Sequence, residues 1–214
     1  MKKNRGFSLV ELIIAVGIMA VLAAAIAPSL IRYINKAKKA DDIVAAETVG
    51  TAFQAASIDD EDVRAYVDRQ RYWAEKENRI RIVCYFDSPS NNTKYQATVQ
   101  IPDIDADLSK VGIDKDNLLD KLDSYLTQTI VPMRFSAFQY LDQYVVAIDK
   151  DGNIYVFFTT GIAHSFAILG PDDDGMYYGS NGYGGKCYEV WPAQSEQYME
   201  MSVPTDAQTK ASGS

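Results

Sequence analysis

One carboxylate lies inside a stretch of sequence that is otherwise apolar. Glu11 is followed by an uncharged, mostly apolar run from Leu12 to Ile31. At a rise of ~1.5 Å per residue this run would form a helix about 30 Å long, the thickness of the hydrocarbon layer of a bilayer. A carboxylate in such a segment is costly unless it is paired, so we expect Glu11 to be functional. No basic residue between Glu11 and Arg32 could pair with it within the helix.

The residues around Glu11 form a motif with a fixed spacing. The motif is Gly6-Phe7-Ser8-Leu9-Val10-Glu11-Leu12, preceded by a basic leader with Lys2, Lys3 and Arg5 and followed by Pro28 within the apolar run. Over residues 1–53 the chain resembles the type IV prepilins, including the related pseudopilins of type II secretion and of DNA uptake. The resemblance implies that a prepilin peptidase cuts after Gly6 and that the same enzyme N-methylates the new amine of Phe7.

The resemblance also implies partners and a location. It implies a structural subunit that is single-pass in the cytoplasmic membrane before assembly and part of an extracellular pilus afterwards. Its partners would be copies of itself, other pilins, the prepilin peptidase/methyltransferase, the pilus assembly platform and, before assembly, the membrane. Glu11 would then reach the Phe7 amine of a neighbouring subunit, because burying that amine unpaired is costly. A minor pilin or a pseudopilin is the alternative within the family.

Two ordinary interpretations compete for the same segment. A secretory signal peptide would be cleaved after Ala27, but the run is long for one, Glu11 lies inside it, and Pro28 would follow the cleavage site. A plain membrane anchor fits the length and leaves Glu11 and the Gly6-Phe7 junction unexplained. A membrane-anchored exported enzyme without a recognisable active site is the alternative from another functional class.

The apolar pattern continues past the run that could span a membrane. Apolar residues from Ile34 to Ala56 recur at steps of three and four, which is typical of an amphipathic helix. We therefore expect a leader at 1–6, a long helix at 7–57 that Pro28 kinks or loosens, a globular head at 58–192 and a disordered tail at 193–214.

The head shows helical and strand patterns in turn. The acidic residues 59–62 predict a helix end or cap, followed by a second helix to Arg79. Strands are expected at 80–86, 95–101, 143–148, 154–160 and 187–191, and a short surface helix at 114–127. The fold class is therefore α+β, with a long amino-terminal helix, transmembrane and then amphipathic, packed on an antiparallel β-sheet head.

Cys84 and Cys187, the two cysteines, both lie in expected strands. In an exported domain they could form a disulfide that closes a loop of about 100 residues, worth up to ~4 to 5 kcal/mol in the chain-entropy model. The alternative is two small buried thiols. The sequence leaves both open, because it does not place the two Cα atoms.

The other candidate metal-binding and catalytic motifs in the sequence match their templates poorly. Residues 149–153 put oxygens at alternate positions as in an EF-hand, but Ile154 and Thr160 stand where the template needs Gly and Glu, so a hairpin turn is favoured. Asp172-Asp173-Asp174-Gly175 reads as a solvated loop, and His164 is a lone histidine without a nucleophile motif. We therefore expect no catalytic residues, no cofactor, no metal and no enzyme activity. Loss of the leader would take the formal charge from -8 to -11, which argues against direct nucleic-acid binding.

Overall fold

The computed structural model describes residues 8–87, 99–102, 108, 112–126, 141, 143–159, 167–173, 176–179 and 185–201. The chain divides into two compact units, Met1–Lys38 and Lys39–Ser214. Several predictions concern residues outside the described ranges: the cleavage junction Gly6-Phe7, residues 95–98 of the second expected strand, His164, and the end of the acidic loop at 174–175.

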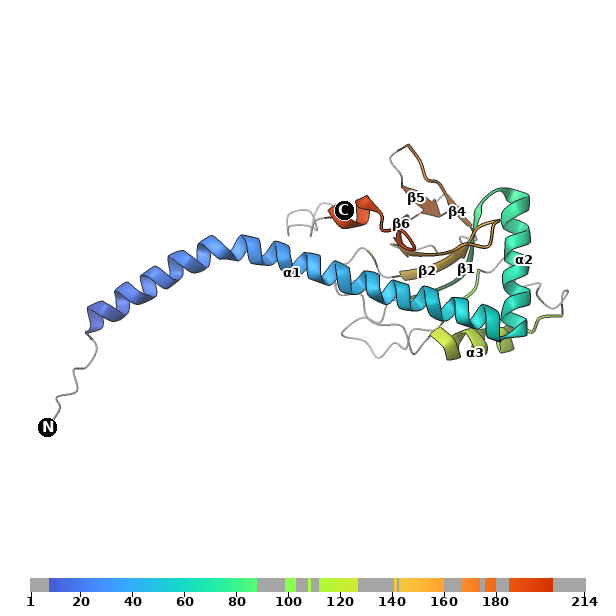
Figure 1. The fold of residues 1–214 in the computed structure, drawn as a ribbon, viewed down its shortest axis with the longest axis horizontal. Coiled ribbons are helices and arrows are strands. Elements are labelled where there is room, and N and C mark those ends of the chain that lie inside the picture. Colours follow the sequence, from blue (N-terminus) through green and yellow to red (C-terminus); the bar gives the residue numbers. More distant parts are fainter. Residues whose placement is uncertain are drawn as a thin grey trace, which may run out of the picture. The chain divides into compact units, whose positions relative to one another are not determined.

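Helix α1, Leu9–Asp59, is the longest element (Figure 1). It continues through Pro28 and ends two residues beyond the expected boundary. In the first unit its described apolar side chains are all exposed. In the second unit it buries a stripe that includes Ile43, Ala46, Val49 and Phe53. These positions are three and four apart, so they share one face of the helix, as the amphipathic pattern predicted.

The acidic segment after α1 begins the next helix, α2, Glu61–Glu77. Asp60 is its N-cap, and its carboxylate accepts hydrogen bonds from the backbone N–H groups of Asp62, at 2.9 Å, and Val63, at 3.1 Å. α2 ends at Asn78, which adopts the left-handed conformation with φ of 50°. This confirms the expected helix and its acidic cap, since a carboxylate satisfies backbone donors that a helix leaves unpaired.

Within the described ranges, six strands form one antiparallel sheet. They are β1 (Ile80–Asp87), β2 (Gln143–Ile148), β3 (Ile154–Thr159), β4 (Ala167–Leu169), β5 (Tyr177–Gly179) and β6 (Lys186–Trp191). Their order is β1-β2-β3-β6-β5-β4, and β4 pairs with β1, so the sheet closes into a barrel. The antiparallel sheet confirms the expected fold class. The closure and the strands β4 and β5 were not predicted, because three residues are too few to show an alternating pattern.

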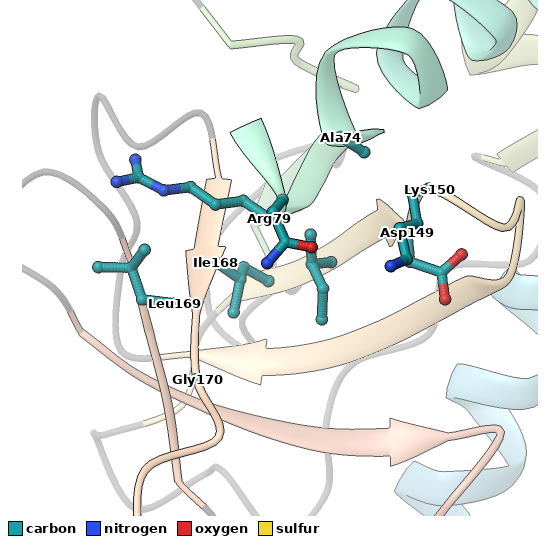
Figure 2. Close-up of a pocket in the computed structure, with 9 residues that line it drawn as sticks. Ala74, Arg79, Asp149, Lys150, Ile168, Leu169 and Gly170 are labelled. Carbon is teal, nitrogen blue, oxygen red and sulfur yellow. The ribbon is translucent and has the colours of Figure 1, made fainter. Parts of the chain in front are cut away.

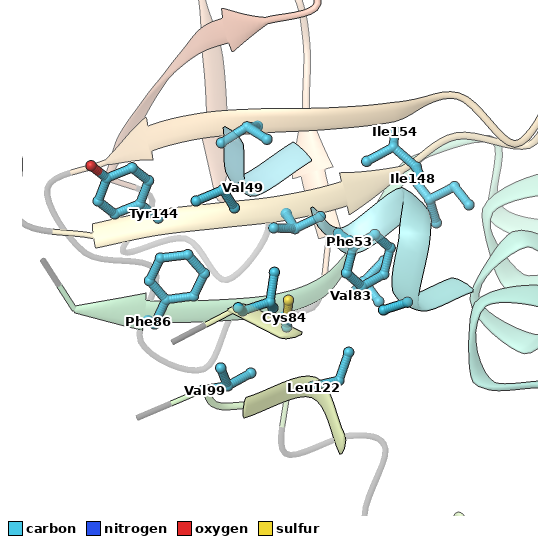
Figure 3. Close-up of a cluster of buried hydrophobic side chains, with 14 of the residues drawn as sticks. Val49, Phe53, Val83, Cys84, Phe86, Val99, Leu122, Tyr144, Ile148 and Ile154 are labelled. Atoms are coloured by element: carbon cyan, nitrogen blue, oxygen red, sulfur yellow. The ribbon is translucent and has the colours of Figure 1, made fainter. Parts of the chain in front are cut away.

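The sheet buries a different cluster on each face. The larger cluster, on the outer face, includes Val83, Cys84 and Val146 and packs against Val49 and Phe53 of α1 (Figure 3). The smaller cluster fills the inside of the barrel with Ile82, Val145, Ala147, Phe157, Ile168 and Cys187. Because successive residues of a strand point to opposite faces, neighbours on β2 belong to different clusters.

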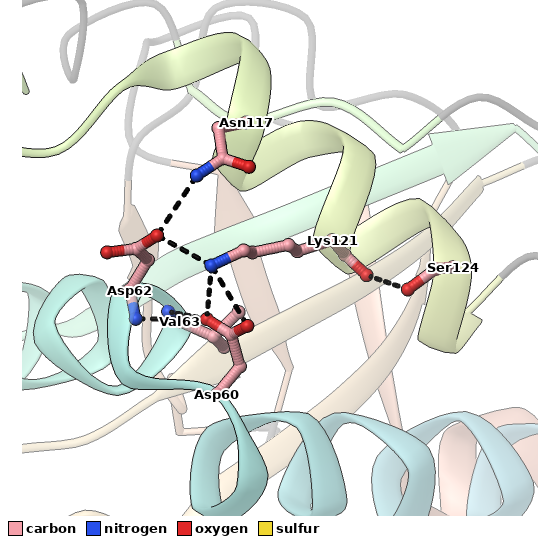
Figure 4. A network of polar contacts seen from close by, with 6 residues as sticks. All are labelled: Asp60, Asp62, Val63, Asn117, Lys121 and Ser124. Carbon is pink, nitrogen blue, oxygen red and sulfur yellow. Dashed lines mark hydrogen bonds and ion pairs between the residues drawn. The ribbon is translucent and has the colours of Figure 1, made fainter.

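The expected surface helix is present as α3, Lys115–Leu126, which buries Leu118, Leu122 and Leu126. The ammonium group of Lys121 lies 2.6 Å from Asp62 and 3.0 Å from Asp60, at the start of α2 (Figure 4). Hydrogen bonds to Asp62 and Asp60 raise the pKa of Lys121. The acidic N-cap of α2 thus also holds α3 in place.

One boundary needs correction. Residues 193–214 were expected to be a disordered tail, but Glu196–Glu200 form a short helix, α4, with Ser195 as its N-cap. Tyr198 of α4 is only 1% exposed. The prediction of disorder rested on the polar composition of the segment. It gave no weight to Tyr198, whose burial stabilises α4. The rest of the expected tail, from Ser202, lies outside the described residues.

Candidate functional site

Glu11 lies in the first turn of α1. The backbone N–H of Ser8 donates a hydrogen bond to Oε2 of Glu11 at 2.9 Å, and the first helical bond runs from Leu12 N–H to Ser8 C=O at 3.2 Å. This is the glutamate half of a capping box, in which the third helical residue binds the amide of the N-cap residue. The Ser-x-x-Glu spacing was visible in the sequence, but its capping role was missed. Glu11 therefore has a partner within its own helix.

The helix that follows Glu11 presents an unusually large apolar surface. Its large hydrophobic side chains range from 43% exposed at Ile34 to 72% exposed at Leu9. Among the described residues, α1 is the one helix that is long and apolar enough to cross a membrane, judged by length and composition. Exposed apolar surface of this extent must be covered by lipid or by other protein.

Pro28 lies inside this apolar stretch of α1. A proline has no backbone N–H, so the carbonyl of Ala24 receives no helical hydrogen bond from it. The next residue, Ser29, donates its hydroxyl to the carbonyl of Ile26 at 2.8 Å. The helix is thus continuous at Pro28 but has one backbone hydrogen bond fewer there.

Cys84 and Cys187 are free thiols, so the disulfide considered from the sequence is not formed. Cys84 belongs to the outer cluster and Cys187 to the interior of the barrel. Burial raises the pKa of both thiols, that of Cys187 to about 11. Both are therefore protonated near neutral pH and unreactive, which is typical of structural buried cysteines.

In the acidic hairpin between β2 and β3, the carboxylate of Asp149 is hydrogen-bonded by groups of the hairpin itself. The carboxylate of Asp149 accepts hydrogen bonds from the backbone N–H groups of Asp151 and Asn153, the side-chain amide of Asn153 and the hydroxyl of Tyr155, all at 2.8–2.9 Å. Partial burial pushes the pKa of Asp149 up, but these donors outweigh it and lower the pKa below its usual value. Gly152, with φ of +88°, allows the tight turn. The geometry supports the hairpin interpretation rather than a calcium loop.

An open pocket of about 290 Å³ lies at one end of the barrel (Figure 2). Apolar side chains of Ile80, Ile168 and Leu169 line it together with Arg79 and Asp149. Asp149 is held in the hairpin network, and no cluster of three potential metal ligands occurs within the described ranges. The charged residues that line the pocket with Asp149 are Arg79 and Lys150.

Comparison with known proteins gives a match at the amino terminus of the chain. Residues 1–27 match the family model described as the prokaryotic N-terminal methylation motif. The chain carries the amino-terminal motif of type IV prepilins and pseudopilins. This prepilin motif supports a pilin-like protein that is processed by a prepilin peptidase, and with the apolar helix it is consistent with a membrane-anchored precursor. No curated protein and no solved structure matches the chain. Inferences about the head therefore rest on the contacts within it.

Proposed function

We propose that this chain is a structural subunit of a type IV pilus-like filament. A prepilin peptidase cuts after Gly6 and methylates the amine of Phe7, and the subunit then leaves the membrane for the filament. The observation that carries the proposal is the exposed apolar half of α1 behind a prepilin motif. Once the subunit has left the lipid, bundling of such helices keeps their apolar surface away from water.

Glu11 is the residue that orders the docking of subunits. Its carboxylate accepts one hydrogen bond from Ser8 within the helix. An ionised carboxylate has about four lone-pair sites, so this bond leaves capacity for a second donor. The Phe7 amine of a neighbouring subunit is a donor whose positive charge is costly to bury unpaired. Pro28 loosens the helix backbone within the same bundle.

The proposed partners follow from this role. They are copies of the chain, other pilins, the peptidase/methyltransferase, the assembly platform and, before assembly, the membrane. The filament lies outside the cell, and the unassembled subunit spans the cytoplasmic membrane once. A pseudopilin or minor pilin would use the same amino terminus. Nucleic acid is not among the proposed partners, since the chain has a formal charge of -8.

The test is the identity of the mature amino terminus. Subunits recovered from cells and from sheared surface fibres are analysed by mass spectrometry. We expect a chain that begins at methylated Phe7, and a Gly6→Leu variant that accumulates as an unprocessed precursor. Ala27→Leu, which alters the rival signal-peptide site, is the matched control and should be processed normally. A mature, unmethylated chain beginning at Pro28 would refute the proposal.

A further inference from the structure

The last described residues of the chain are bound to α1 by buried polar contacts. Nζ of Lys39 donates hydrogen bonds to the carbonyls of Met199, at 2.6 Å, and Met201, at 2.5 Å. Lys39 is only 4% exposed. These two carbonyls lie at the end of α4, where a helix leaves carbonyl groups without intrahelical donors. The ammonium group thus caps the carboxyl-terminal end of α4 from a different helix.

A second polar contact joins the same two helices. The hydroxyl of Tyr198 donates to Oδ2 of Asp42 at 3.1 Å. Asp42 is 2% exposed and lies three residues after Lys39, on the same side of α1. The ring of Tyr198 packs edge-on against Phe158, with 5.3 Å between ring centroids, and Nζ of Lys39 lies 5.8 Å from the Tyr198 centroid. α4 is therefore wedged between α1 and the sheet.

The contacts of α4 with α1 place two charged side chains, Lys39 and Asp42, in the protein interior, where the loss of hydration costs free energy. Burial lowers the pKa of Lys39, and burial together with Asp42 raises the pKa of Tyr198. Further along the helix, α1 contacts the head through apolar side chains such as Ala46, Val49 and Phe53. Apolar contacts are not directional, whereas hydrogen bonds to buried charges are lost when donor and acceptor move apart.

A close steric contact lies about three turns further along α1. A Cβ atom on Gly50 would come within 2.6 Å of the indole ring of Trp191 on β6. Only glycine fits under the ring at this separation. If α1 moved by one helical turn in the head, a larger side chain would meet Trp191 and Lys39 would leave the carbonyls of α4. Both contacts are thus satisfied in one position of the helix.

We propose that Ser195–Met201 is a carboxyl-terminal latch that fixes the register of α1 in the head, with Lys39 and Asp42 as its positioning residues. The latch is a property of the single chain. Its consequence for assembly rests on the proposed filament function. There, the register determines at which height on the bundled helices each head is carried, so subunits with an open latch would not stack uniformly.

Hydrogen exchange tests the latch in the full-length chain in detergent micelles. The reporters are the amides of Tyr198, Met199 and Met201, which are hydrogen-bonded at α4. In Lys39→Met we expect these amides to exchange about tenfold faster or more, because the α4 carbonyls lose a charged donor. Amides of β2 and β3 should keep their protection.

The controls separate the latch from general stability. Thr48→Ala, on the exposed side of α1, should leave exchange in α4 unchanged. Tyr198→Phe keeps the aromatic ring but removes the hydroxyl that bonds Asp42. It should accelerate exchange in α4 alone, so it serves as the test if Lys39→Met does not fold. Unchanged α4 exchange in the folded variants, or equal acceleration throughout the head, would overturn the proposal.

Register is measured separately, by the fluorescence of Trp191 in a Trp73→Phe background. Release of the latch should shift Trp191 emission to longer wavelength and increase its quenching by iodide. If α4 exchange accelerates while Trp191 is unaffected, α4 is attached by the contact but does not set the register. Both measurements use unassembled chains, so they stand even if the chain forms no filament. Fewer subunits in sheared fibres, with normal amino-terminal processing, is the result expected of both variants in cells.

Discussion

Replacement of Glu11 by alanine separates the local role of this carboxylate from the role that we propose for it between subunits. Within the chain, Glu11→Ala removes the hydrogen bond from the Ser8 amide. Loss of such a helix-capping contact costs about 1 kcal/mol and is confined to the first turn of α1. Between subunits, loss of one partner of a buried ion pair costs about 3–5 kcal/mol, because the other charge remains buried and unpaired.

These magnitudes predict different outcomes for different steps. A cost of about 1 kcal/mol at a helix end should leave expression and membrane insertion intact. Cleavage after Gly6 should also continue. A cost of about 3–5 kcal/mol at each docking step corresponds to a factor of a hundred or more, so fibres should be lost or greatly reduced. Glu11→Gln keeps the capping geometry and a hydrogen-bond acceptor, so its assembly defect should be milder.

The assay compares mature subunit in total membranes with subunit in the sheared fibre fraction, by quantitative immunoblotting. Glu47→Ala is the matched control, because Glu47 is an exposed carboxylate on the same helix outside the apolar run. It should assemble normally. Normal fibre yield from cells that contain only the Glu11→Ala subunit would refute the docking role. A failure of Glu11→Ala to be cleaved would place its effect before assembly.

Three further predictions concern the head. Cys84 and Cys187 should react with a thiol reagent at neutral pH only after unfolding and should run without a disulfide on a non-reducing gel, because both thiols are buried and burial raises their pKa; fast labelling of the native protein would contradict this. Asp149→Asn should lower the free energy of unfolding, and the difference from wild type should shrink as the pH falls below about 4. The sign follows because the pKa of Asp149 is lower in the folded state, so its contribution is present above the unfolded pKa and is lost on protonation; a difference that grows towards low pH in urea denaturation would be the opposite of what we expect. Gly50→Ala should destabilise the head by about 1–3 kcal/mol in the same assay, since its methyl group would overlap the ring of Trp191; Thr48→Ala is its control, and equal stability of the two variants would show that the ring can move aside.

Local patterns were sufficient for the elements that are long enough to show them. The apolar run and its amphipathic continuation predicted α1, the acidic residues before Val63 predicted the start of α2, and the spacing of Leu118 and Leu122 predicted α3. The turn residues 149–153 predicted the β2–β3 hairpin. Each of these features depends on residues within about ten positions of one another, where propensity, capping and periodicity act.

The prepilin motif could also be identified from the sequence, because a cleavage motif and an apolar run are each contained in a short linear segment. The position of Glu11 in an apolar run is the basis of the role that we propose for it. Its hydrogen bond to Ser8 could have been anticipated from the same spacing.

Contacts between distant segments were decided only by the tertiary structure. The faces of Cys84 and Cys187 depend on strand register, and a register shift between Ile82 and Cys84 alters the alternation in β1, so the two thiols lie in different clusters. Closure of the barrel depends on β4, which is too short to be seen locally. Lys39 and Tyr198 are far apart in the chain, and only packing brings the lysine to the carbonyls of α4. A side chain's neighbours in a fold are set by long-range packing, and a single sequence records no trace of that pairing.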